Sequence, residues 1–194
     1  MSDNVLHSSK SNEWYTPNLY IDLARAVMGN IELDPASSEE ANKRIGANRY
    51  YTKQNSAFLY NWEAKTVWLN PPYGQYTGRF VRKLLRHYYD DDIEQAIILL
   101  NANPGRAYWR GLWEFPVCFT QHRIRFFDAD GNQQDRPPHE NAFIYLGPIV
   151  RWPTFYDVFK SQGVVVMNFE KVIDWPGGWL YDQYRPDFDD SDLP

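Results

Sequence analysis

Cysteine and long apolar runs are both scarce in this sequence. Cys118 is the sole cysteine among 194 residues, which excludes an internal disulfide and any zinc site built on cysteine. His122 and His139 have no partner cluster either, so no metal site is predicted. No apolar run approaches the roughly 18 residues needed to cross a membrane, and the N-terminal residues lack the basic and apolar regions of an export signal. These absences predict a cytoplasmic protein.

An excess of positive charge is lacking as well. The net charge is −5 and the mean hydropathy is −0.62, so long-range attraction to nucleic acid is not a property of the whole chain. Part of the acidity is local, because residues 181–194 contain five aspartates and one arginine. We interpret this segment as a solvated, disordered acidic tail, residues 1–10 as a disordered N-terminus, and residues 11–180 as a single domain.

Segments typical of helices and strands alternate along the first half of the chain. Apolar periodicity predicts helices over residues 18–28 and 76–89, and short strands over 31–34, 50–52, 66–69 and 95–100. Mainly strands follow, over residues 117–120, 124–127, 141–146 and 163–169, with a short helix near 154–160. This order predicts an α/β fold with one mostly parallel sheet and antiparallel additions.

The first predicted helix has distinct boundaries. Pro17 suits its first position and Thr16 suits its N-cap, because proline needs no N–H partner there and a threonine hydroxyl can accept one. Gly29 follows the last periodic residue, as a C-terminal cap commonly does. The segment Trp14–Pro17 therefore leads directly into a helix.

A short strand ending in an acidic residue comes next. It covers Ile31 to Asp34 and breaks at Pro35, and a helix is predicted to start near Ser37 or Ser38. In doubly wound sheets, ligands bind at the turn between such a strand and its helix. Asp34 is thus a candidate ligand-binding residue; taken alone, a role as the N-cap of the following helix explains it better.

Residues 66–74, T-V-W-L-N-P-P-Y-G, form the segment around which we expect the fold to be organised. The apolar residues before Asn70 are typical of a buried strand. Two consecutive prolines have no N–H to donate, so the chain must leave the sheet at Asn70. This places an amide, two stiff carbonyls and the Tyr73 ring at the carboxyl end of a strand, where open α/β sheets bind ligands.

These groups suit the binding of a planar NH2 group. Such an amine is a poor nucleophile, because its lone pair is delocalised. The side-chain oxygen of Asn70 and the carbonyl of Pro71 can accept its two hydrogens and favour the geometry in which the lone pair faces an electrophile. Tyr73 can stack on a base, which contributes about 1–3 kcal/mol. The alternative is a Pro-Pro turn with a packing tyrosine, and these four residues alone do not decide between the two.

Three segments in a fixed order resemble those of a known family. They are W-Y-T-P at residues 14–17, L-D-P-A-S at 33–37 and N-P-P-Y-G at 70–74. Their order and spacing resemble the phage-type DNA N6-adenine methyltransferases, the Dam-like enzymes encoded in bacteriophages and prophages. The likeness continues through residues 96–101, 108–109 and 123–126, and covers roughly residues 13 to 147.

The resemblance implies a fold, a cofactor and two sets of site residues. The fold is the Rossmann-like α/β sheet of S-adenosylmethionine-dependent methyltransferases, and the cofactor is S-adenosyl-L-methionine. A carboxylate such as Asp34 suits the charged sulfonium and amino groups of that cofactor. By the resemblance, Tyr15, Thr16, Pro17, Asp34, Pro35, Ala36 and Ser37 bind the cofactor, and Asn70, Pro71, Pro72 and Tyr73 form the catalytic loop.

Two positions depart from the methyltransferase pattern. Residues 35–42 contain no glycine, whereas the wider pattern has glycines that let the backbone approach the cofactor; the phage-type family has a similarly glycine-poor turn. Relatives also carry an acidic residue shortly before the position of Phe58. Asn55 or Ser56 would then bind the adenine ring of the cofactor in its place.

The activity implied by the resemblance is methyl transfer to adenine N6 in double-stranded DNA, with the base flipped out of the duplex. A phage-encoded enzyme of this kind would act in the cytoplasm of a bacterial host. N-P-P-Y loops also occur in enzymes that modify other planar NH2 groups, such as a protein glutamine, cytosine N4 or an RNA base. The glycine-poor turn and the acidic tail also fit a non-catalytic module that binds nucleic acid or a host protein.

Basic residues in loops are the candidates for DNA binding, because the chain has little room for a separate recognition domain. Phosphate contacts are assigned to Arg106, Arg110, Arg123 and Arg136. A surface ion pair is the alternative for each of them. The basic stretch Arg79–His87 fits either a nucleic-acid contact or a solvated helix face.

Overall fold

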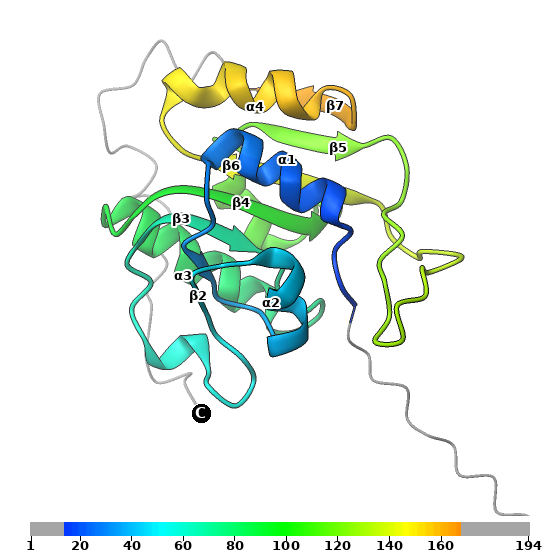
Figure 1. The fold of residues 1–194 in the computed structure, drawn as a ribbon. Coiled ribbons are helices and arrows are strands. Elements are labelled where there is room, and N and C mark those ends of the chain that lie inside the picture. Colours follow the sequence, from blue (N-terminus) through cyan, green and yellow to red (C-terminus); the bar gives the residue numbers. More distant parts are fainter. Residues whose placement is uncertain (1–13, 168–194) are drawn as a thin grey trace, which may run out of the picture.

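The computed structural model describes residues 14–167, in which helices and strands alternate as predicted. The predicted tails at residues 1–10 and 181–194 lie outside the described residues. Figure 1 follows the chain through these elements. In order they are α1 (Asn18–Met28), β1 (Leu33–Asp34), α2 (Glu39–Ile45), β2 (Arg49–Tyr50), η1 (Ala57–Leu59), β3 (Ala64–Leu69), α3 (Thr77–Tyr89), β4 (Ile93–Asn101), η2 (Ala107–Leu112), β5 (Val117–Thr120), β6 (Asn141–Leu146), η3 (Ile149–Arg151), α4 (Trp152–Phe159) and β7 (Gly163–Val166), where η denotes a 3-10 helix.

The strands within this part of the chain join one mixed sheet in the order β2-β1-β3-β4-β6-β5-β7. The first four strands in that order pair in parallel. β6, β5 and β7 are then added by antiparallel pairing. The prediction of an α/β fold in one domain, with a mostly parallel sheet and antiparallel additions, is confirmed.

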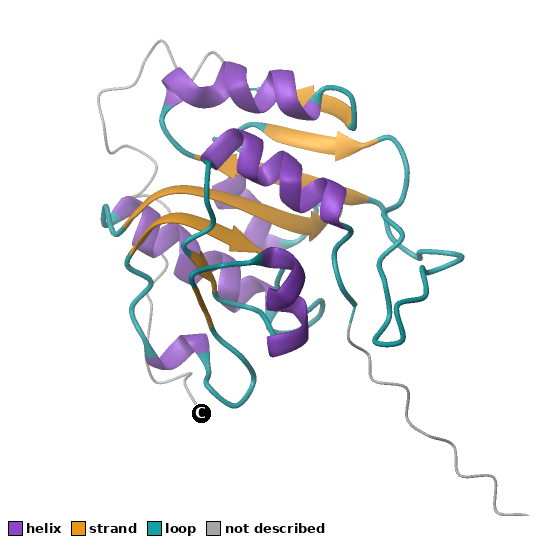
Figure 2. Cartoon of the chain, viewed as in Figure 1, coloured by secondary structure: helices purple, strands orange, loops and turns teal. Residues whose placement is uncertain are grey.

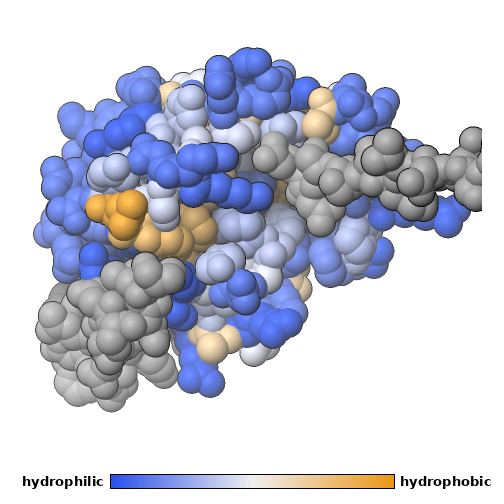
Figure 3. Space-filling view, turned by 90° about the horizontal axis from the view of Figure 1, so that it is seen from below, coloured by the Kyte–Doolittle hydropathy of each residue, from blue (hydrophilic) through white to orange (hydrophobic). Residues whose placement is uncertain are grey.

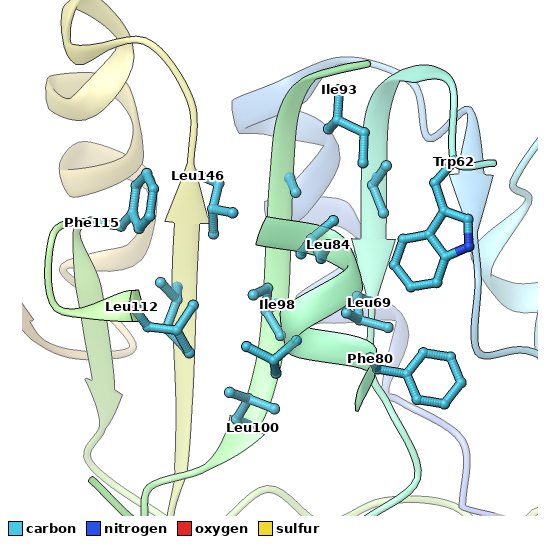
Figure 4. Packing of buried hydrophobic residues seen from close by; sticks show 14 of the residues in the cluster. Trp62, Leu69, Phe80, Leu84, Ile93, Ile98, Leu100, Leu112, Phe115 and Leu146 are labelled. Atoms are coloured by element: carbon cyan, nitrogen blue, oxygen red, sulfur yellow. The ribbon is translucent and has the colours of Figure 1, made fainter. Parts of the chain in front are cut away.

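Helices cover both faces of the sheet (Figure 2). The alternation of side chains along β4 shows why its sequence is apolar throughout: Ala96, Ile98 and Leu100 belong to the core formed with α3 and η2, and Ile97 and Leu99 belong to the core formed with α1 and α4. A strand buried on both sides needs such a continuous apolar run. Figure 4 shows the first of these cores, in which side chains of β4 pack with those of α3 and η2.

α1 covers the predicted residues, but its predicted N-cap is wrong. The residue before the helix is Pro17, and no side chain caps the helix start. The hydroxyl of Thr16 instead accepts a hydrogen bond from the amide of Asn70 at 3.2 Å. A contact between residues far apart in the sequence therefore replaces the local cap.

The predicted strand at residues 124–127 is also absent. Ile124 and Phe126 are buried and Arg125 is exposed, as in a strand, but the segment joins no ladder. The N–H of Ile124 donates to the side-chain oxygen of Asn141 at 3.1 Å, and Phe127 makes only isolated bridges, to Tyr15 and Gln133. The pattern of burial is right, and the hydrogen-bond partners are not those of a sheet.

The two sequence segments of greatest interest meet at one edge of the sheet. β1 and β3 are parallel neighbours, with Leu33 opposite Val67. Asp34 is the last residue of β1, and Asn70 is the first residue after β3. Because parallel strands end at the same edge, the turn after Asp34 and the loop that starts at Asn70 lie next to one another.

The surface is mostly hydrophilic on the side shown in Figure 3, where apolar side chains form one small patch and a few isolated spots. Scattered apolar side chains of this kind are normal on a folded domain. Within residues 14–167, no helix is both long enough and apolar enough to span a bilayer.

Candidate functional site

The loop after β3 is fixed by the first residue of α3. Thr77 is buried, and its hydroxyl donates to the carbonyl of Pro72 at 2.9 Å and accepts from the N–H of Gly74 at 3.1 Å. Gly74 has φ 121°, in the region that favours glycine. One side chain thus holds two backbone groups of the Asn-Pro-Pro-Tyr loop.

Asn70 is half-buried at the start of this loop. Its Nδ2 donates to the Thr16 hydroxyl at 3.2 Å, which sets the orientation of the amide plane. Among residues 14–167, no hydrogen bond is made to the amide oxygen on the other side. The amide is therefore held by its nitrogen and keeps its oxygen available as an acceptor.

Asp34 lies at the end of β1 with only 1 % of its surface exposed. Its carboxylate accepts a hydrogen bond from the N–H of Ala36 at 3.0 Å, and no ion pair reaches it from the described part of the chain. Burial raises the pKa of Asp34 to about 7, although hydrogen bonds from Ala36 and Ser37 oppose the shift. A buried carboxylate without a basic partner is suited to a cationic ligand.

A hollow joins Asp34 to Asn70. Its cavity volume is about 50 Å³, which is smaller than the about 300–1,000 Å³ common for small-molecule sites. Its walls come from the segment before α1, the turn after β1, helix α2 and the start of the loop after β3. The lining residues are Trp14, Tyr15, Thr16, Asp34, Ala36, Ala41, Arg44, Ile45 and Asn70.

Helix α2 contributes a cation that sequence analysis did not identify. The guanidinium group of Arg44 lies 4.9 Å from the ring centre of Phe127 and 5.9 Å from that of Tyr15. It therefore connects α2 to the two segments that form the Tyr15–Phe127 bridge. The position of Arg44 on the helix after the Asp34 turn was a usable signal, because such a helix flanks the turn.

The predicted cofactor-binding residues divide into two groups. Tyr15, Thr16, Asp34 and Ala36 line the hollow, while Pro17, Pro35 and Ser37 adjoin them in the chain without lining it. Asn55 and Ser56 lie in a separate turn after β2. The Asn55 N–H bonds to Thr52 and the Ser56 hydroxyl caps η1.

Tyr73 stands beyond the prolines with 42 % of its surface exposed. Desolvation raises the pKa of its hydroxyl, a hydrogen bond with Asn141 opposes the shift, and Tyr108 adds to it. The hydroxyl end of Tyr73 therefore lies near Asn141 at the start of β6, and an exposed part of the side chain remains for contact with a planar ligand.

The four arginines assigned to DNA have different surroundings. Arg106, Arg110 and Arg136 are exposed. Arg123 is also exposed but forms an ion pair with Glu140 at 2.6 Å and donates to the carbonyl of Pro137 at 3.2 Å. For Arg123, the alternative of a surface ion pair is what the structure shows.

Within the described range, no group of three or more histidine, cysteine, aspartate or glutamate side chains is arranged to hold a metal ion. His122 instead lies beside the hydroxyl of Tyr20, at 3.4 Å.

The fold defines a class of protein. A mixed α/β sheet that is parallel from β2 to β4 and antiparallel beyond it is the sheet of a Rossmann-like methyltransferase. The chain belongs to the DNA N-6-adenine-methyltransferase (Dam) family, whose sequence profile matches residues 3–154. No curated protein matches the chain significantly. The family assignment confirms the resemblance drawn from the three motifs.

Proposed function

We propose that this protein transfers a methyl group from S-adenosyl-L-methionine to N6 of adenine in DNA. The observation that carries the proposal is the hollow that joins Asp34 to Asn70 in a chain of the DNA N-6-adenine-methyltransferase family. The catalytic unit is the domain of residues 11–180, and its place of action is the cytoplasm of a bacterial cell, where the DNA is.

The hollow fits the charged part of the proposed cofactor. The cofactor supplies an electrophilic methyl group on a sulfonium ion, and its methionine part carries an ammonium and a carboxylate. Asp34 provides a buried carboxylate, and Arg44, which also lines the hollow, provides a positive charge. A cavity of about 50 Å³ admits only part of such a molecule, so the rest of the cofactor would lie along the surface outside it.

The loop after β3 orients the accepting amine. The oxygen of Asn70 and the carbonyl of Pro71 accept the two N–H groups of adenine N6, and a flipped base stacks on the ring of Tyr73. The amine loses its proton after the methyl group has arrived, so no strong base is required. Catalysis then depends mainly on positioning and on preorganised acceptors.

Asn70→Ala separates the role of the amide from cofactor binding. We expect methyl transfer to fall by at least about a hundredfold, because one preorganised acceptor is lost. Calorimetry should show cofactor binding close to that of the wild type, because the charged contacts at Asp34 and Arg44 remain. Loss of both binding and transfer would contradict the role assigned to Asn70.

The acceptor is tested with the same enzyme and a tritiated methyl donor. DNA from a host without adenine methylation, total RNA and protein extract are offered in parallel, and the labelled product is digested to identify the modified base or side chain. We expect label in DNA as N6-methyladenine. Label in RNA, in cytosine or in a protein glutamine would show that the acceptor is that group and not adenine N6. Failure of the cofactor to bind would indicate a non-catalytic module.

A further inference from the structure

The basic side chains close to the catalytic loop are concentrated on two neighbouring elements. α3 starts directly after the loop and carries four lysines or arginines and no acidic residue. η2 packs beside α3 and has Arg106 at its start and Arg110 within it, again with no acidic residue. This surface is therefore positive although the whole chain is negative.

Arg82 and Arg106 both lie beside Tyr108. A Cβ placed on Gly78 would lie 3.3 Å from Nη1 of Arg82 and 3.5 Å from Cδ1 of Tyr108, so these side chains meet over the first turn of α3. Side chains of a helix lean toward its N-terminus, which directs Arg82 toward the loop that precedes α3. The charge of Arg106 acts on the Tyr108 hydroxyl and opposes the rise in its pKa that burial causes.

Tyr108 also connects this surface to the catalytic loop. It lies close enough to Tyr73 to contribute to the raised pKa of that residue, and its side chain is half-buried between η2 and α3. The order across the surface is thus the partly exposed side chain of Tyr73, the ring of Tyr108, and an arginine beside it from each element. Aromatic rings interleaved with arginines suit a nucleic-acid strand, because rings stack on bases and guanidinium groups bind phosphates.

Arg82 and Arg106 are both exposed residues, and neither forms an ion pair with another described residue. The alternative surface, residues 121–140, differs in this respect. Arg123 is already paired with Glu140, and the segment also contains Asp128, Asp130 and Asp135, which would repel a phosphate backbone.

We propose that Arg82 and Arg106 bind backbone phosphates on either side of the flipped adenine, so that DNA lies across α3 and η2 rather than over residues 121–140. The inference rests on the proposed function, since it names the surface by which the same substrate is bound. It adds Arg82, which the loop-based assignment omitted, and it removes Arg123.

The salt dependence of DNA binding tests this surface. A fluorescein-labelled, adenine-containing duplex is titrated with the full chain across a series of KCl concentrations, and binding is followed by fluorescence anisotropy. Each lost phosphate contact lowers the slope of log K against log salt by about 1. We expect a fall of about 1 for Arg82→Gln and for Arg106→Gln, and of about 2 for the double variant.

Lys160→Gln is the matched control. It removes the same charge from the residue that follows α4, a helix that packs on the opposite face of the sheet, and Lys160 is paired there with Asp157 at 2.7 Å. The wild-type slope should be retained in this variant. Circular dichroism verifies that every variant is folded.

Three outcomes would overturn the inference: unchanged slopes for Arg82→Gln and Arg106→Gln, a lowered slope for Arg123→Gln alone, or no binding of the duplex by the wild type. The proposed function fails separately. If the wild type binds DNA through these arginines but transfers no methyl group, the surface stands and the enzymatic proposal falls. If it methylates DNA and the slopes do not respond to either arginine, the activity stands and the surface falls.

Discussion

At the scale of single residues, Asp34 has a charge state that serves binding but opposes folding. Its carboxyl group is buried, and burial raises its pKa from 3.8 to about 7. A rise of that size means that ionising this carboxyl group costs about 4 kcal/mol more in the folded protein than in the unfolded chain. Because the folded pKa exceeds the unfolded one, the protein is most stable with Asp34 protonated. This contribution to stability is complete below about pH 4 and is lost as the pH rises through about 7. The carboxylate that a cationic ligand needs is thus obtained at the expense of stability.

Asp34→Asn should therefore stabilise the protein and abolish cofactor binding. The asparagine oxygen can still accept the N–H of Ala36, and no charge is left to desolvate. Above the raised pKa, we expect the free energy of unfolding to increase by about 1–4 kcal/mol. We also expect the rise in melting temperature that S-adenosylmethionine gives the wild type to disappear, since a ligand stabilises only a state that binds it. Thermal denaturation with and without cofactor measures both effects, and a destabilised variant would contradict the argument.

At the scale of elements, the loop after β3 and the start of α3 act as one unit. Pro71 is buried and Pro72 exposed, and the two prolines limit the backbone of the loop by themselves. Thr77 then ties the carbonyl of Pro72 and the N–H of Gly74 to the helix. The position of the Pro71 carbonyl, which we assign to the accepting amine, therefore depends on a side chain that does not touch the substrate.

Thr77→Val tests this positioning role. The change keeps the volume but leaves a carbonyl and an N–H without their partner, which costs about 1–3 kcal/mol. We expect kcat to fall by about 10–100-fold, while KM for S-adenosylmethionine stays unchanged because Thr77 does not line the hollow. Thr77→Ser keeps the hydroxyl and should restore a rate near that of the wild type. Equal losses in the valine and serine variants would indicate a structural role only.

The neighbourhood of Asp34 and Asn70 was predictable from the sequence, because it follows from two parallel strands that end at one edge. Arg44 and Thr77 were not identified from the sequence. Arg44 contacts aromatic rings of distant segments, and Thr77 forms hydrogen bonds with backbone groups of the loop before it. The sequence predicted Thr16 as the N-cap of the helix that follows it, because periodicity and propensity describe only sequence neighbours. Contacts such as that between Thr16 and Asn70 require the fold itself.

At the scale of the whole molecule, two buried groups give stability opposite dependences on pH. His87 is buried near the end of α3, where its Nδ1 lies 2.7 Å from Asp92. Burial lowers the pKa of His87, and the hydrogen bond with Asp92 opposes the shift. As the pH falls, this histidine is therefore protonated in the unfolded chain before it is protonated in the folded protein. The contribution of neutral His87 to stability is complete above about pH 6.5 and is lost as the pH falls. Asp34 has the reverse effect in an overlapping pH range.

We expect these dependences to offset one another in the wild type between about pH 4 and pH 7. Asp34→Asn removes one of them, so stability in that variant should fall clearly as the pH decreases below about 6.5. Adding His87→Gln should flatten the profile again, whatever its effect on the absolute stability. Urea denaturation across this range gives the profiles of stability against pH. An unchanged profile in Asp34→Asn would show that the pKa of the Asp34 carboxyl group is not shifted.

The one thiol of the chain gives the molecule an internal reporter. Cys118 is fully buried in β5 with its Sγ 3.6 Å from the carbonyl of Phe159 in α4, and burial raises its pKa to about 12. Since alkylating agents attack the thiolate, iodoacetamide should leave the folded protein unmodified and label each molecule once when β5 and α4 separate. The rate of alkylation, followed by mass spectrometry, would time the opening of the antiparallel half of the sheet without any engineered label.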